Sequence, residues 1–433
     1  MERHTVAYSR VAITGIGLVS PLGISTAENV ERCRKGESAI GPIHNFDVQG
    51  HSCSAAAYVR EFDLMAGLRF PKNRKFMNHS VECAMRAARE AIEQSGVDLE
   101  KMDPARVAIY TGSGQTGIEY ESYFQALAAA WNGNPEMDFK DLGGLPSHLI
   151  DRYIVLRTLS NSGLALLSTE FGIRGPSGNS VQSDTASAQA LEFAYYDLVE
   201  GRCDVALAGG YDSLLGVSSF LAYQKAGLLS PSPPDEAYRP FDARRDGLVL
   251  GAGAGFFVLE QWEHAQERGA AIFGELCGIG AVTETGDANT PARGAESLRG
   301  AESLRGATGQ ALADAGVDFV VARGIGTPEE DRREADSIFA LLGPDIPVTA
   351  LKSHTGYLGA ATAAVELGLG LLCARDGLVP PIARHCSADR DCGLNLVARQ
   401  PRPLEERYAP LGLFLSYSWG GQVTAIAARA IHD

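Results

Sequence analysis

The chain has 433 residues, 45% of them hydrophobic and 21% charged, which is enough for one large globular unit or two fused ones. Its formal net charge of −15 argues against a nucleic-acid partner. No apolar run reaches membrane-spanning length and the N-terminus lacks an apolar signal region, so we expect a cytoplasmic protein with no membrane span. Eight cysteines without CxxC pairs fit a reducing compartment and argue against disulfides or a zinc site.

The first half of the chain alternates buried strands with amphipathic helices. Strands are predicted over 11–19 and 106–114, and apolar residues spaced by three and four predict a helix over 78–95. The Gly-x-Gly within the first strand lacks a third glycine and a ribose-binding acid at suitable spacing, so we expect no dinucleotide cofactor. Residues 120–170 are expected to be mostly helical, with breaks at Pro135 and Pro146.

The stretch 175–215 is the most informative part of the sequence. A Gly/Pro turn and a short polar strand precede a helix that is expected to begin at Asp184 and to end at Gly201, and a buried strand starts at Val205. Ser187 therefore falls in the first turn of a buried helix, close to its free N–H groups and the positive end of its dipole. A nucleophile could stand there, and so could an ordinary capping serine, which is the commoner case.

The second half begins after a loop that leads from Pro240 into a buried strand ending at Glu260, and a new series of strands and helices starts near Ala271. We expect two halves, 1–260 and 261–433, each of the α/β class. Residues 293–304 repeat the hexapeptide RGAESL. We interpret the repeat as a tolerated duplication that lengthens a helix by nearly two turns.

The stretch around Ser187 resembles the nucleophile region of the β-ketoacyl-acyl carrier protein synthases, which belong to the thiolase superfamily. In that family a cysteine follows a Thr-Ala pair and a strand ending in Ala-Gly-Gly comes next; here Ser187 follows Thr185-Ala186. The resemblance implies an α/β fold of the thiolase-like type, duplicated and five-layered as α/β/α/β/α. The two halves would then be ketosynthase N-terminal and C-terminal types, and an acyl carrier protein would be a partner.

The other catalytic positions of the family can be found by their motifs. The first histidine precedes a Gly-x-Gly-Thr-Pro turn, which here is 324–328, and the preceding residue is Arg323. The second histidine follows Lys-Ser-x-Thr-Gly, which here is 352–356, and the next residue is Tyr357. The resemblance therefore implies a degenerate site in which the lysine, Lys352, is kept while the cysteine and both histidines are replaced.

Further positions are assigned by the same resemblance. Asp331 and Glu334 match acidic positions after the Thr-Pro and are expected to support the site, while His354 stands where the family uses no catalytic group and is expected to pack. The candidates for substrate binding are Thr327, Trp419 in the place of the usual gating phenylalanine, Gly420 and Gly421.

Decarboxylative condensation needs a soft nucleophile and donors for two oxyanions. Arg323 cannot serve as a base because it does not deprotonate at workable pH. Each missing oxyanion donor typically costs about 10²–10³ in rate, so we do not expect this chain to condense acyl units by itself. The pattern resembles the chain-length factors of type II polyketide and polyene or fatty-acid systems. That resemblance implies a heterodimer with an active ketosynthase subunit, whose acyl tunnel this chain would shape.

Two alternatives stay open at this point. Ser187 could act as the nucleophile of an acyltransferase or hydrolase with Lys352 as its base, although Lys352 is more simply explained as a partner of Asp331 or Glu334. A decarboxylase is the other alternative, because ketosynthase-like decarboxylases have a glutamine at the nucleophile position. Here the nearby glutamine, Gln189, faces elsewhere on the helix than Ser187.

One local feature bears on the acyl carrier protein, which is acidic. The cluster of basic residues that could attract it is Arg69, Lys72, Arg74 and Lys75. Such a cluster is more often an ordinary solvated surface.

Overall fold

The computed structural model describes residues 10–64, 67–114, 124–125, 127–128, 131, 151–283, 316–404 and 409–432. Pro135, Pro146 and the RGAESL repeat at 293–304 lie outside these residues. The predicted strands over 11–19 and 106–114 and the predicted helix over 78–95 are confirmed. None of the described helices is long and apolar enough to cross a membrane.

The strands of the first half lie side by side in the order β1-β7-β6-β4-β5. β4 runs parallel to β5 and β6, while β7 is antiparallel to both β6 and β1. Four of the five are buried along nearly their whole length, which explains their continuous runs of apolar residues. Their bounds are β1 Val11–Val19, β4 Val107–Ser113, β5 Ser177–Val181, β6 Val205–Ser213 and β7 Leu250–Gln261.

The second half repeats this arrangement in the order β8-β15-β14-β9-β10, with β14 and β9 parallel and β15 antiparallel to both β14 and β8. The antiparallel pairing of β1 with β8 joins the two sets into one sheet of 13 strands among the described residues. The bounds are β8 Gly274–Thr283, β9 Phe319–Val321, β10 Pro347–Thr349, β14 Leu411–Tyr417 and β15 Gln422–Ala430.

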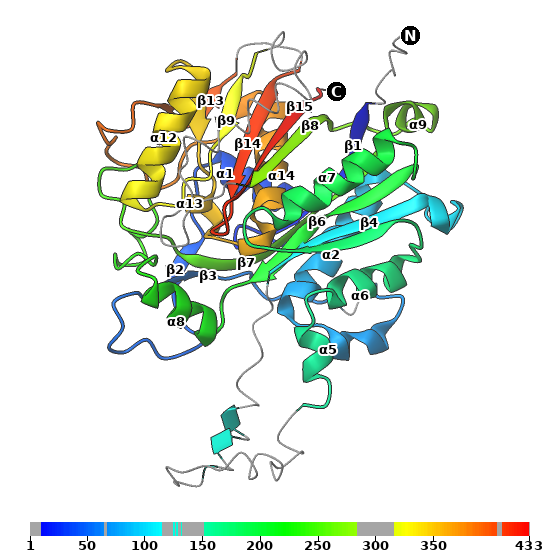
Figure 1. Cartoon of the computed structure of the whole chain (residues 1–433), viewed down its shortest axis with the longest axis horizontal. Helices are drawn as coiled ribbons and strands as arrows, with labels where there is room; N and C mark the ends of the chain where they lie inside the picture. Colours follow the sequence, from blue (N-terminus) through cyan, green and yellow to red (C-terminus); the bar gives the residue numbers. More distant parts are fainter. Residues whose placement is uncertain are drawn as a thin grey trace.

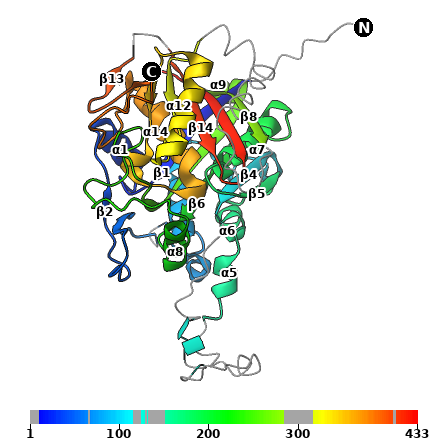
Figure 2. The same ribbon diagram turned by 60° about the vertical axis from the view of Figure 1, so that its left-hand side comes forward.

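Helices form the other layers (Figure 1). α7 (Ala186–Val199) and α14 (Thr362–Arg375) lie in the middle and contact strands of both halves, and every residue of α14 except Arg375 is buried. α2 (His79–Ser95) and α6 (Ser162–Phe171) cover the outer side of the first half, and α12 (Pro328–Leu342) packs on the second, as Figure 2 also shows. The expected duplicated, five-layered thiolase-like α/β fold is therefore confirmed.

The remaining elements are short and connect these layers. The helices among them are α1 Thr26–Arg34, η1 Pro71–Phe76, η2 Pro104–Arg106, α5 Ile154–Thr158, α8 Val217–Lys225, α9 Trp262–Glu267, α13 Lys352–Thr355 and η3 Gly359–Ala361. The strands among them are β2 Ile40–Pro42, β3 Ala55–Ala57, β11 Leu378–Val379, β12 Asn395–Leu396 and β13 Arg402–Pro403. The expected division after residue 260 falls at the end of β7.

Two glycines let α7 begin directly against the sheet. A side chain at Gly112 in β4 would come within 2.4 Å of the backbone nitrogen of Ser187, and one at Gly210 in β6 within 2.6 Å of the Ser187 β-carbon. Such distances leave no room for any residue but glycine. The close approach to the two glycines therefore sets where the first turn of α7, which carries Ser187, packs on the sheet.

Candidate functional site

Ser187 lies at the centre of the molecule and is fully buried. Its hydroxyl oxygen accepts a hydrogen bond of 3.1 Å from the backbone N–H of Ala364 in α14, so it links the two central helices. The capping position of α7 belongs to Thr185, whose side chain makes no capping bond. A serine needs a base in contact with its proton to become a nucleophile, and the lysine proposed for that role is bonded elsewhere.

Lys352 is buried beside Glu366 of α14. Its ammonium group donates to both carboxylate oxygens of Glu366, at 3.1 and 3.0 Å, and to the carbonyl oxygen of Arg323 at 2.7 Å. Burial raises the pKa of Glu366 to about 7, although Lys352 opposes that shift. The expectation that Lys352 would pair with Asp331 or Glu334 is wrong, because all three of its donor directions are used by other groups.

Arg323 stands where the family has its first histidine, and it is 4% exposed. Its Nε donates to Asp184 Oδ2 at 3.0 Å, its Nη1 lies 3.5 Å from Glu330 Oε2, and its guanidinium carbon lies 4.6 Å from the ring centre of Trp419. Burial lowers the pKa of Arg323, but the surrounding carboxylates, Asp184 first among them, outweigh burial and the net shift is upward. The side chain is therefore a permanent cation that cannot accept a proton.

Tyr357 stands where the family has its second histidine and is fully buried. Its ring lies beside that of Tyr223 in α8, with 5.9 Å between the ring centres. Burial, with a smaller contribution from the Asp184 carboxylate, raises the pKa of Tyr357 well above its ordinary value of 10. This position therefore carries a neutral phenol, which can neither accept a proton as a base nor carry charge at neutral pH.

The acidic residues after the Thr-Pro turn hold the backbone of the loop that carries Arg323. Glu334 accepts the N–H groups of Arg323 and Gly324 at 2.7 and 2.8 Å, and Asp331 accepts those of Gly326 and Phe241 at 2.9 and 2.8 Å. Burial raises the pKa of Glu334 to about 7 and that of Asp331 to about 6. Because these bonds reach backbone atoms, the loop keeps its shape whatever side chain replaces the histidine.

The expected substrate-binding residues lie in two separate loops. Trp419, which is 38% exposed, Gly420 and Gly421 follow β14, and the neighbouring Ser418 hydroxyl lies 2.9 Å from that of Ser183 before α7. Thr327 precedes α12, and its carbonyl accepts a hydrogen bond from Arg245 at 3.3 Å. Of these residues, Trp419 lies with its ring against the guanidinium group of Arg323.

His354 has a different environment from the other candidate residues. Its two ring nitrogens each lie 2.7 Å from a backbone carbonyl oxygen, one of Glu37 and one of Pro381. The imidazole is fully buried between these two loops, and its hydrogen-bonding atoms are occupied there rather than at Ser187 or Arg323.

Sequence reasoning missed Asp184 and Glu366, the two acids that pair with the cations of the site. The sequence could have pointed to Glu366, because it is the single charged residue in a run of otherwise apolar and small residues from Thr362 to Ala374. A lone charge on a fully buried helix needs a partner of opposite sign. For Asp184 the only signal was its place next to the Thr-Ala pair.

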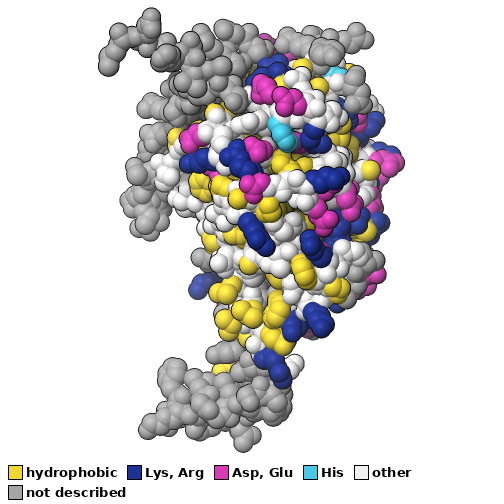
Figure 3. All heavy atoms as spheres, turned by 90° about the vertical axis from the view of Figure 1, so that its right-hand side faces the viewer, with side chains coloured by type: hydrophobic (Ala, Val, Ile, Leu, Met, Phe, Trp, Pro, Cys, Tyr) yellow, Lys and Arg dark blue, Asp and Glu magenta, His cyan; other side chains and the backbone are white. Residues whose placement is uncertain are grey.

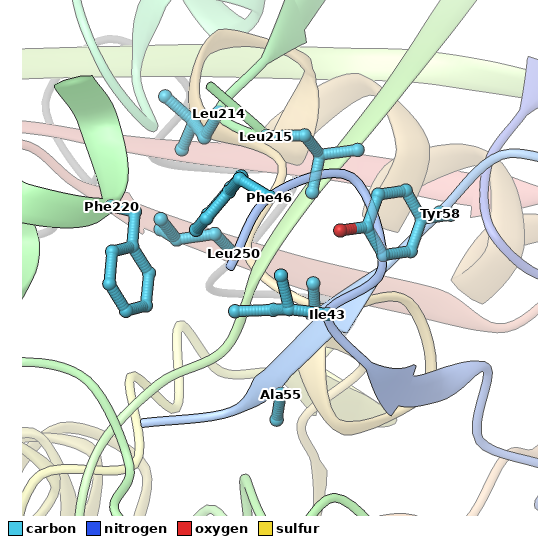
Figure 4. A pocket seen from close by; sticks show the side chains of 9 residues that line it. Ile43, Phe46, Ala55, Tyr58, Leu214, Leu215, Phe220 and Leu250 are labelled. Carbon is cyan, nitrogen blue, oxygen red and sulfur yellow. The ribbon is translucent and has the colours of Figure 1, made fainter. Parts of the chain in front are cut away.

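A separate, small apolar hollow lies between β3, β7 and α8 (Figure 4). Its one polar side chain, Tyr58, donates its hydroxyl hydrogen to Asn45 Oδ1 at 2.6 Å. The hollow contains no nucleophile, acid or base. The residues that line it are Ile43, Phe46, Ala55, Ala56, Tyr58, Leu214, Leu215, Phe220 and Leu250.

Comparison with known proteins gives a consistent result. The model of the beta-ketoacyl synthase N-terminal domain matches residues 8–265, and that of the C-terminal domain matches residues 275–385. The ketoacyl synthase beta subunit of the tetracenomycin polyketide synthase from Streptomyces glaucescens is 30% identical, over 97% of this chain and 98% of its own length.

Two solved structures are similar over nearly their whole length. The ishigamide ketosynthase/chain length factor has a TM-score of 0.84 at 25% identity, covering 99% of this chain and 100% of its own. A ketosynthase in complex with its type II polyketide synthase acyl-carrier protein has a TM-score of 0.83 at 25% identity, covering 98% and 100% of the two chains.

Proposed function

We propose that this chain, which belongs to the beta-ketoacyl synthase family, is a chain-length-factor subunit of a type II system. It pairs with an active ketosynthase, contributes to the wall of that partner's acyl tunnel, and does not condense acyl units itself. The observation that carries the proposal is Arg323, which stands in a histidine position as a buried cation paired with Asp184.

The chemistry of the site supports a non-condensing role. Condensation needs a thiolate to hold the acyl group and neutral donors that stabilise the thioester oxygen and the enolate. Ser187 provides a hydroxyl that is already bonded to α14, and Arg323 and Tyr357 replace the two imidazoles.

The alternative of a serine acyltransferase has no support in the geometry. Its base would be Lys352, whose three hydrogen bonds go to Glu366 and to the carbonyl oxygen of Arg323 and not to Ser187. The decarboxylase alternative is opposed by Gln189, whose side-chain oxygen accepts a hydrogen bond from Ser180 at 2.6 Å on another side of α7.

The surface of the first half suits a partner subunit. β5 is the last strand of the described sheet on this side, and Val181 at its end is 41% exposed. On the adjoining α7, Phe193 and Tyr196 are 46% and 39% exposed. Hydrophobic side chains also gather lower on this side of the molecule, at the height of α5 and α6 in Figure 1 (Figure 3). An open strand edge beside exposed aromatic rings is a surface that pairs with another chain, and in isologous pairing the same surface serves both subunits.

The basic cluster lies on the surface, where Arg69 is 3.6 Å from Glu100 and Arg74 is 3.0 Å from Glu82. Arg69, Lys72, Arg74 and Lys75 are all exposed on and beside η1. The buried carboxylate of Glu170 accepts the backbone N–H groups of Arg69 at 2.6 Å and of Phe70 at 3.2 Å. These bonds anchor the backbone just before η1. We therefore propose this segment as the place where an acidic acyl carrier protein approaches the chain, which is otherwise strongly negative.

Intact-protein mass spectrometry tests the proposal. The chain is incubated with acyl carrier protein carrying acetyl and malonyl groups, alone and with ketosynthases encoded in the same genome. We expect a stable complex with one cysteine-bearing partner, product only when that partner is present, and no acyl adduct on this chain. An acyl adduct on the isolated chain that Ser187→Ala abolishes would overturn the proposal in favour of an acyltransferase.

A further inference from the structure

We infer that Glu192 of α7 selects the chain that covers the pairing face of the first half. It opposes a second copy of this chain and favours a different subunit that brings a basic side chain. The pairing face is β5 together with the exposed side of α7, which carries Gln189, Glu192, Phe193 and Tyr196. The inference rests on the proposed function, because it explains how a chain with this fold pairs with another subunit and not with itself.

Glu192 is a half-buried acid whose carboxylate has no ion-pair or hydrogen-bond partner in the part of the chain that the structure describes. Burial raises the pKa of Glu192, and no neighbouring cation opposes this shift. The other acid of α7, Asp197, has one carboxylate oxygen 2.6 Å from the guanidinium group of Arg202 and accepts the hydroxyl of Tyr110 with the other. The two acids therefore differ, because only Asp197 is neutralised within the chain.

Contacts on both sides of Glu192 show where it lies on the pairing face. One turn earlier in α7, Gln189 accepts a hydrogen bond from Ser180 of β5 at 2.6 Å. The residue after Glu192, Phe193, has its ring 5.8 Å from that of Tyr110 in β4. Glu192 therefore lies between two points at which α7 touches the outermost strands.

These two points give the height of Glu192 along β5. Ser180 is the fourth of the five residues of β5, and Tyr110 pairs with Gly178, which is the second. The residue between them, Asn179, is the middle of the strand. An edge strand that pairs with its own copy over its whole length does so around its middle, where the two-fold axis passes. In a self-paired form the two copies of Glu192 would therefore both lie near this axis.

A second copy offers nothing on this face that could neutralise Glu192. β5 contains no charged residue, and α7 contains no lysine, arginine or histidine. Self-pairing would therefore bring two carboxylates together and remove water from both, and like charges brought together in an interface oppose binding. A different subunit with a basic side chain at this place would instead form an ion pair, flanked by the exposed rings of Phe193 and Tyr196.

Self-association of the full-length chain tests the inference with no other protein present. Sedimentation velocity over a range of micromolar concentrations gives the dissociation constant of the self-paired form. We expect weak self-association of the wild type and a dissociation constant lowered by about tenfold or more in Glu192→Gln, which keeps the size of the side chain. Glu200→Gln is the matched control, because it removes the same charge from an exposed acid at the end of α7 that lies 3.2 Å from Arg202. This control should leave the dissociation constant unchanged.

A charge exchange at the same position gives a second readout. Native mass spectrometry of an equal mixture of the wild type and an isotope-labelled Glu192→Lys chain should show mixed pairs in excess over self-pairs, because opposite charges then meet near the axis. No gain in self-association in Glu192→Gln would overturn the inference, and so would a statistical proportion of mixed pairs. Both measurements omit the ketosynthase, whereas product formation with a partner synthase reports on the proposed function, so the failure of one can be told from that of the other.

Discussion

The two ion pairs of the site differ in how completely they are satisfied. The Lys352–Glu366 pair is closed, with three acceptor atoms around the ammonium group and both carboxylate oxygens bonded. The Arg323–Asp184 pair shares one hydrogen bond and lies against a half-exposed tryptophan ring. The first pair joins α13 to α14 within the second half of the fold, whereas the second pair connects loops of both halves.

This difference bears on which of the two pairs supports the stability of the fold. Removing one partner of a fully satisfied buried pair leaves an uncompensated charge, so the lysine and its acid can be lost only together. The loop that carries Arg323 is held through backbone atoms, so the side chain at this position could change without loss of the fold. The following predictions test this contrast, from the largest expected effect to the smallest.

Lys352→Met should lower the free energy of unfolding by about 3–5 kcal/mol, because it leaves Glu366 buried without its partner. Urea unfolding at pH 8, where Glu366 is mostly ionised, measures the effect. The double variant Lys352→Met/Glu366→Leu should recover most of the loss, because a buried ion pair can be replaced by apolar residues of similar size. If the double variant is as unstable as the single one, the loss of stability does not come from leaving Glu366 without its partner.

The closed pair also predicts a pH dependence. The pKa of Glu366 is raised from 4.5 to about 7 in the folded chain, so the folded state holds this proton more tightly than the unfolded state. Its stabilising contribution is therefore complete below about pH 4.5 and is lost as the pH rises through 7, by on the order of 3 kcal/mol.

Unfolding curves between pH 4 and 8 measure this loss. Glu366→Gln should flatten the pH profile relative to the wild type. Asp331 and Glu334 titrate in the same range and are present in both chains, so the difference between the two profiles isolates Glu366. Parallel profiles would show that Glu366 does not contribute.

Arg323→Met should cost less than Lys352→Met, about 1–3 kcal/mol, because it removes one hydrogen bond from Asp184, whereas Lys352→Met removes two from Glu366. The measurement is the same urea unfolding, and Arg333→Met, whose side chain is 27% exposed in α12, serves as the control. A cost equal to that of Lys352→Met would remove the distinction between the two pairs.

Trp419→Ala should have the smallest effect on stability, about 0.5–1 kcal/mol, which is the range for a cation–π contact at a partly exposed site. Trp419→Phe should recover part of it. Thermal unfolding of the wild type and the two variants gives the comparison. A loss of stability above about 2 kcal/mol would mean that Trp419 supports the core in addition to its contact with Arg323.

Much of the fold could be predicted from the sequence. The strands now called β1 and β4 and the helix α2 follow from runs of apolar residues and from spacings of three and four, because local periodicity reflects which faces are buried. The replaced catalytic positions were also visible, because Arg323 and Tyr357 lie next to glycine motifs that keep their spacing.

The partners of these residues could not be predicted in the same way. Lys352 was assigned to Asp331 or Glu334, which are near in the motif, and the structure pairs it with Glu366 of α14. Glu334 instead binds backbone N–H groups of its own loop. Motif spacing says which residues are near in the chain, but it does not say which charge lies opposite another across a packed core.

The sequence by itself determined the class of the fold, the family and the loss of the cysteine and both histidines, because each of these depends on residue identity and local order. Only the tertiary structure decided that Ser187 bonds to α14 and that Arg323 lies between Asp184 and Trp419. The physical reason is that the three segments around Arg323 are separated by more than ninety residues each and meet only when the two halves pack around α7 and α14.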